Sequence, residues 1–155
     1  MPWTTPKTWA TGELVTAADL NTHLRDNLNF LLSPNFQEAV GSGTDFSTTS
    51  TTYADITGMS VTITTAGGNL LVSAFGRFTG SAGANAFLAI NLDGTDYEVN
   101  TAATVSGSGL YVCALRRFVV SAGAHTVKLR LRTESGSYAA SFVGGTSRRL
   151  LVVEG

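Results

Sequence analysis

The residue types that most often carry chemistry in proteins are sparse in this sequence. It has two histidines, His23 and His125, and one cysteine, Cys113. Neither histidine has a cysteine or a second histidine at metal-ligand spacing, so the pattern does not predict a zinc centre. Cys113 lies among apolar neighbours without an adjacent charge, so we expect a small buried side chain rather than a nucleophile. A single cysteine also excludes an intramolecular disulfide.

Three acidic residues, Asp93, Asp96 and Glu98, fall close together beside a predicted hairpin turn. Carboxylates that meet at one end of a hairpin can bind calcium, and a suitable pair can hydrolyse a glycoside. The loop lacks the density of acidic ligands found in strong calcium sites, and Asp93 already has a role in the turn. We therefore expect no cofactor, no metal and no enzymatic activity, with a weak calcium site at these acids left open.

Arginine is the one polar residue type that clusters, late in the chain. Three interpretations fit the cluster: a solvated outer sheet face that blunts edge pairing, salt bridges between subunits, or contact with an anionic host-surface glycan. Arginine suits the last two because its guanidinium binds carboxylates in a bidentate fork. We favour pairing between subunits. The six residues are Arg116, Arg117, Arg130, Arg132, Arg148 and Arg149.

The composition and charge exclude several classes of protein. Charged residues make up 14% of the chain, against about 25% in ordinary globular domains. The hydrophobic share of 43% is too high for a disordered chain, and a net charge of −1 argues against a nucleic-acid binder. No apolar run could span a bilayer, and the N-terminus lacks a signal-peptide pattern. We therefore expect cytoplasmic synthesis and no membrane insertion.

One helix is predicted, near the N-terminus. Thr16 can act as its N-cap, with Asp19 completing a capping box. The helix should end at Ser33, because the residue before Pro34 is disfavoured in the α region. Its apolar residues recur every three or four positions and form a single stripe. The stripe consists of Leu20, Leu24, Leu28 and Leu31.

A helix this short is marginal alone and needs a surface to pack on. One alternative is that it lies on its own domain's sheet. The other is a short self-associating stalk, in which Leu24 and Leu31 take heptad position a while Leu20 and Asn27 take position d. An asparagine in such a seam specifies register and oligomeric state.

The segment before the helix is predicted to be an extended arm, because it contains Pro2 and Pro6. Its two tryptophans, Trp3 and Trp9, need burial somewhere, since each has a large apolar face. They could fold back on the chain's own sheet or anchor the arm on a neighbouring subunit. We favour the anchor.

After the arm and helix the chain has the pattern of short strands. Met59, Val61 and Ile63 alternate with hydroxyl residues, and residues 125–133 alternate apolar and polar side chains. Asp93-Gly94 is a strong hairpin signal. About eight such strands, with no helical period between them, predict a mainly β protein, an antiparallel β-sandwich or jelly roll.

Two glycines, Gly41 and Gly43, mark a linker between the arm and the strands. We place a domain boundary there, with residues 1–43 as an attachment and trimerisation module. Residues 44–155 form the β-sandwich domain.

The helix and the segment before it carry a specific motif: Trp9-Ala-Thr-Gly12-Glu13-Leu-Val15-Thr16-Ala17-Ala18-Asp-Leu20-Asn21, followed by Leu24-Arg25-Asp26-Asn27. This motif resembles the N-terminal segment of small bacteriophage virion proteins of the tail-fibre, minor-tail or head-decoration type. The resemblance covers residues 3–32. Beyond these residues the chain shares only a general style, a Thr/Ser/Gly-rich β-domain that closes on a basic strand.

The resemblance implies a virion part and a homotrimer. Trimeric jelly rolls of phage fibre heads, similar to the tumour-necrosis-factor fold, match the strand count. We therefore expect a surface-displayed structural protein of the virion, either a capsid decoration or a short tail or tail-tip component, whose partners are other capsid or tail proteins. The alternative is a receptor- or carbohydrate-binding head domain of a tail fibre.

Overall fold

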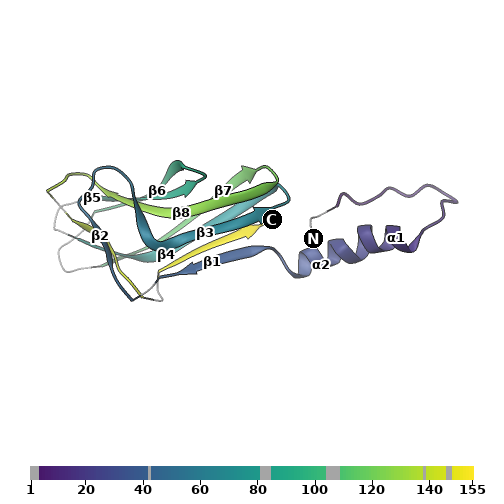
Figure 1. Ribbon diagram of the computed structural model, residues 1–155, viewed down its shortest axis with the longest axis horizontal. Coiled ribbons are helices and arrows are strands. Elements are labelled where there is room, and N and C mark those ends of the chain that lie inside the picture. The colour runs from purple at the N-terminus through teal and green to yellow at the C-terminus, as the bar shows by residue number, and fades with distance from the viewer. Residues whose placement is uncertain (1–3, 42, 81–84, 104–108, 138, 146–147) are drawn as a thin grey trace.

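The computed structural model describes residues 4–41, 43–80, 85–103, 109–137, 139–145 and 148–155. Two antiparallel sheets pack face to face, and an N-terminal helical segment projects from one end of them (Figure 1). This segment has three consecutive parts: α1 (Ala17–Leu20), a π-helical turn η1 (Asn21–Arg25) and α2 (Asp26–Leu32). The expected mainly β fold, an antiparallel β-sandwich of the jelly-roll type, is confirmed.

The first sheet, here called sheet A, has the strand order β1-β10-β4-β9-β2, with β7 also paired to β4. Every pairing in it is antiparallel. Its strands are β1 (Phe36–Val40), β2 (Phe46–Thr48), β4 (Gly68–Gly80), β7 (Leu110–Val120), β9 (Ala140–Phe142) and β10 (Arg149–Glu154).

The second sheet, sheet B, has the order β3-β8-β5-β6 and is also antiparallel throughout. Its strands are β3 (Ala54–Thr65), β5 (Asn85–Leu92), β6 (Thr95–Ala103) and β8 (Gly123–Thr133). The described residues therefore form ten strands rather than about eight. The two additions, β1 and β2, are short segments in which alternation is hard to recognise.

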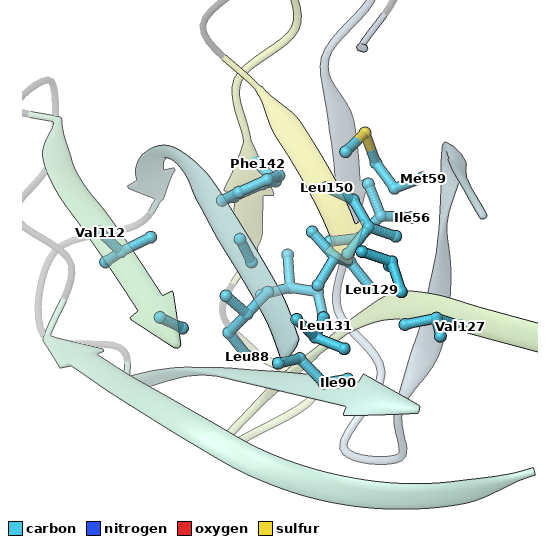
Figure 2. Close-up of a cluster of buried hydrophobic side chains, with 14 of the residues drawn as sticks. Ile56, Met59, Leu88, Ile90, Val112, Val127, Leu129, Leu131, Phe142 and Leu150 are labelled. Carbon is cyan, nitrogen blue, oxygen red and sulfur yellow. The ribbon is translucent and has the colours of Figure 1, made fainter. Parts of the chain in front are cut away.

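The core lies between the sheets and follows from the alternation of side chains along each strand. In β8, Val127, Leu129 and Leu131 are fully buried while the residues between them face outward. Figure 2 shows these side chains meeting Leu88 and Ile90 of the same sheet and Leu150 and Phe142 of the opposite one. Burial of these inward faces is the main force that holds the sheets together.

The predicted hairpin at Asp93-Gly94 is confirmed. Both residues have positive φ, 50° and 90°, as a tight turn between β5 and β6 requires. The Asn91 side chain stabilises the turn by accepting a hydrogen bond from the Gly94 backbone N–H at 3.1 Å.

The boundary between the helical segment and the sandwich differs from the expected one. Residues 36–40 form β1, which pairs with β10 along its whole length and so belongs to sheet A. The boundary therefore moves from residues 41–43 to residues 33–35. Gly41 lies inside the sandwich, where its N–H donates to the Arg148 carbonyl at 2.8 Å.

Candidate functional site

The start of the helix is built as its sequence predicts. The Thr16 hydroxyl accepts a hydrogen bond from the Asp19 backbone N–H at 3.2 Å, and the Asp19 carboxylate accepts one from the Thr16 N–H at 3.2 Å. These reciprocal bonds satisfy backbone donors that a helix start leaves open. The capping box is confirmed.

The leucine stripe of the helix is exposed to solvent. The exposed fractions are 47% for Leu20, 54% for Leu24, 49% for Leu28 and 63% for Leu31. The helix therefore does not lie on its own sheet, which was one of the two alternatives. The arm borders Leu20 and Leu24 through Pro6 and Trp9, but about half of each leucine in the stripe stays exposed in the described part of the chain.

The arm folds back along its own helix (Figure 1). The Thr4 backbone N–H donates to the Asn27 side-chain oxygen at 2.9 Å, and the Asn27 amide donates to the Thr4 carbonyl at 2.8 Å and to the His23 carbonyl at 3.2 Å. Asn27 is only 4% exposed. Asn27 thus holds the arm of its own chain, which corrects its expected place in a seam between helices.

Trp9 also lies against its own helix. Its ring meets the His23 ring edge-on at 6.4 Å between centroids, and the Lys7 ammonium lies 4.6 Å from the indole centroid. Lys7 pairs in turn with Glu13 and Asp19, and the hydrogen bond to Glu13 is the main cause that raises the pKa of Lys7. Trp9 remains 39% exposed, so its role as an anchor on a neighbour stays a prediction. Trp3 lies outside the described residues.

A second apolar surface lies on the outer face of sheet A. Residues directly opposite each other in a sheet share one face, and the strand register places the outward residues in cross-strand rows. One row runs Phe36, Val153, Leu71 and Arg117, and the next runs Glu38, Leu151, Ser73 and Leu115. The exposed large apolar residues of this outer face are Phe36, Val40, Leu71, Phe75, Tyr111, Leu115 and Val119, with exposed fractions from 40% to 77%.

Cys113 lies on this same outer face and is exposed. The expectation of a buried thiol is wrong. In β7 the neighbours Val112 and Ala114 point into the core, and alternation sends the residue between them outward. Because the residues on both sides of Cys113 are apolar, the sequence pattern does not show which of the three face the core.

Two of the clustered arginines are paired within their own chain, on the outer face of sheet B. Arg130 lies 2.6 Å from the Asp96 carboxylate and 2.8 Å from that of Asp55. Arg132 lies 3.2 Å from Glu98 and 3.7 Å from the centroid of the Phe87 ring. These partners replace the pairing between subunits that we expected for the two residues.

The other four arginines have separate environments. Arg148 is fully buried, where it donates to the carbonyls of Phe142 at 3.2 Å and Thr57 at 3.1 Å. It therefore cannot contact a subunit or a glycan, and burial lowers its pKa. Arg149 pairs with Glu38 at 3.0 Å.

Arg116 faces inward, with its guanidinium 4.6 Å from the Tyr97 ring centroid. Arg117 is exposed on the outer face of sheet A. Within the described residues, no hydrogen bond, ion pair or ring contact is found for the Arg117 side chain.

The three clustered acids have different partners. Asp93 accepts a hydrogen bond from His125 at 2.7 Å, Asp96 pairs with Arg130, and Glu98 accepts from the Tyr53 hydroxyl at 2.7 Å. Across the described ranges, no group of three histidine, cysteine or acidic side chains could hold a metal ion.

His125 is held at both ring nitrogens. Nδ1–H donates to the Asp93 carboxylate, and Nε2–H donates to the Ser121 carbonyl at 2.9 Å. A histidine with two acceptors is favoured in its protonated form. The hydrogen bond to Asp93, followed by that to Ser121, raises the pKa of His125.

No protein-family model matches the chain, and a search of curated proteins gives no match. Solved structures share its fold. Murine APRIL aligns with a TM-score of 0.50 at 8% identity, over 79% of this chain and 99% of that one. Dimeric latent PorU from Porphyromonas gingivalis aligns with a TM-score of 0.51 at 11% identity, over 77% of this chain and 12% of that one. At such low sequence identity, these structural alignments show a common β-sandwich fold and nothing further.

The helical segment is also too short to cross a membrane. In the described residues, no helix combines the length and hydropathy of a membrane span.

The sequence already contained a pattern that indicates an apolar outer face of sheet A. The strand Leu110–Val120 is apolar at almost every position, and residues 70–72 and 150–153 are apolar without interruption. Continuous apolar runs are typical of strands covered on both faces. That pattern predicts a second cover for sheet A, beyond the one supplied by sheet B.

Proposed function

We propose that this chain is a structural protein of a bacteriophage virion. It acts as a homotrimer that displays its β-sandwich outward and docks through its arm and helix on a capsid or tail protein. The motif within residues 3–32 supports the virion role. The observation that carries the proposal is the exposed leucine stripe on a helix that stands clear of the sandwich, because a stripe of this kind needs a helical or protein partner.

The proposal is tested by incorporation of the full-length chain into virions. Phage particles that lack the chain are complemented with wild-type protein or with Leu24→Lys, and the chain is quantified in gradient-purified particles. Wild-type protein should co-purify with particles, and Leu24→Lys should fall by about tenfold or more, since a buried lysine at an interface is costly.

Asn29→Lys is the matched control. Asn29 is exposed on the same helix but lies away from the stripe, so its substitution should leave incorporation near the wild-type level. Absence of the wild-type chain from particles would overturn the virion role. Equal incorporation of Leu24→Lys and wild type would show that incorporation depends on the stripe neither through direct docking nor through trimerisation.

A second candidate is a receptor- or carbohydrate-binding head domain. The observation in its favour is the pair of half-buried rings, Tyr53 and Phe87, on either side of Arg132 on the outer face of sheet B. Sugars stack on such rings and bond to the neighbouring charged groups. An array of anionic host-surface oligosaccharides, probed with wild-type protein and with Arg132→Ala, tests this candidate. Binding that depends on Arg132 supports it.

A further inference from the structure

We propose that the outer face of sheet A packs against other copies of this chain. The face comprises the outward residues of β1, β10, β4 and β7, and its apolar members are Phe36, Val40, Leu71, Phe75, Tyr111, Leu115 and Val119. The inference rests on the homotrimer proposed above and specifies the surface that joins the sandwiches.

The size of the face fits a stable association. Its seven large apolar residues are each 40% to 77% exposed. Together they present several hundred Å² to solvent, comparable with the roughly 800 Å² that each partner buries in a standard protein interface. The largest apolar patch on an ordinary monomer is about 300–600 Å². The exposed apolar face of sheet A therefore lies at or above the upper end of what a monomeric protein usually presents to water.

The few charged groups of the face favour an apolar partner over a charged one. Glu38 and Arg149 neutralise each other within the face at 3.0 Å. Arg117 is on the edge strand β7, where a long side chain can extend past the apolar patch into solvent. Arg77 is a further cation of this face, opposite Tyr111 in the register, and its guanidinium packs over Gly109. Because the large apolar side chains outnumber these four charged groups, an apolar partner surface suits the face better than a strongly charged one such as an anionic glycan or a nucleic acid.

The closeness of the face to the helix along the chain favours a second copy as the occupant. The leucine stripe ends at Leu31, and Phe36 is the first outward residue of β1. Leu31 and Phe36 are five residues apart, so at most about 18 Å of fully extended chain separates them. In the proposed trimer, copies joined along their stripes hold their sandwiches close together at the Phe36 end, where the outer faces of sheet A can pack against one another.

The test measures the mass of the full-length protein in solution by light scattering. Wild type should have the mass of three chains at micromolar concentration. The double variant Leu115→Lys/Val119→Lys should raise the dissociation constant by about a hundredfold or more, because it puts two charges in an apolar interface. Thr62→Lys on the outer face of sheet B is the matched control and should remain trimeric. Circular dichroism checks that each variant folds.

Cys113 gives a second readout on the same face. In the wild-type trimer its thiol should react with a bulky maleimide about tenfold more slowly than in the double variant, because neighbouring copies cover it. Equal rates would contradict the proposal.

The outcomes separate this inference from the proposed function. A double variant that stays trimeric while Leu28→Lys becomes monomeric would overturn the sheet interface and leave the stripe-based trimer standing. A wild-type protein that is monomeric at all concentrations would overturn both the trimer and this interface. The virion role would then still depend on the incorporation experiment alone.

Discussion

The two sheets of the sandwich share one core but differ sharply on their outer faces. The outer face of sheet B is polar, and its charges are matched across strands, as in Arg130 with Asp55 and Asp96. The outer face of sheet A is apolar and, over the described residues, has only one matched ion pair, Arg149 with Glu38. A face whose polar groups are already satisfied is stable in water, whereas an apolar face gains free energy when it is covered. The outer face of sheet B is stable in water as it stands, whereas the apolar outer face of sheet A supports the proposed packing against other copies.

The largest effect is expected where the two sheets meet. Leu129→Ala removes a fully buried side chain and should lower the free energy of unfolding by about 2–5 kcal/mol, through lost burial and the remaining cavity. Leu115→Ala is the matched change on the outer face of sheet A. In dilute monomer it should cost about 0.5 kcal/mol or less. Urea unfolding of both variants measures the contrast.

The concentration dependence of stability sharpens this contrast. If sheet A is covered by other copies, the wild-type melting temperature should rise with protein concentration, by mass action. Leu115→Ala should flatten that rise, while Leu129→Ala should lower the curve without changing its slope. A melting temperature independent of concentration in the wild type would contradict a covered face.

A smaller effect is expected at His125, which links the β5–β6 hairpin of sheet B to the turn between β7 and β8. The pKa of His125 is raised above 6.5, so its contribution is fully present below that pH and is lost as pH rises through the raised value. The pKa of Asp93 is lowered below 3.8 despite desolvation, through its bonds to His125 and Thr126. Its contribution is present above that pH and is lost as pH falls through the lowered value.

The pair should therefore stabilise the fold most in mildly acidic solution. Between about pH 6 and pH 8 the free energy of unfolding should fall by about 1 kcal/mol or less, since Asp93 is half exposed and partly screened. Asp93→Asn keeps a residue that tolerates positive φ and should remove most of this dependence. Unchanged pH dependence in Asp93→Asn would show that another group is responsible.

The smallest effect is expected on the outer face of sheet B itself. Asp55→Asn breaks the exposed ion pair with Lys128 at 2.7 Å and weakens that with Arg130. It should change the free energy of unfolding by about 1 kcal/mol or less, and less still at high salt. It should also leave the mass in solution unchanged. A loss of trimer in Asp55→Asn would move the interface from sheet A to sheet B.

Local patterns in the sequence determined much of the fold. The capping box at Thr16, the turn at Asp93-Gly94 and the alternation in residues 125–133 each depend on neighbours within a few positions. Backbone sterics and the two-residue period of a strand are enough to specify such features. The sequence also determined that the leucine stripe exists, since a helix places residues three and four apart on one face.

Only the tertiary structure decided whether each residue with an ambiguous pattern faces the core or the solvent. Cys113 sits in a segment where both neighbours are apolar, so its exposure depends on the register with β4. Arg148 is buried because its guanidinium reaches the carbonyls of Phe142 and Thr57, and Thr57 is distant in sequence. Asn27 could have faced another helix, but the arm returns to it from residues that are distant in sequence. Where both faces of a strand are apolar, local pattern cannot say which one faces the core, because the free energy of burial is the same for either. Pairing with distant strands makes that choice, and in this protein it leaves the outer face of sheet A open.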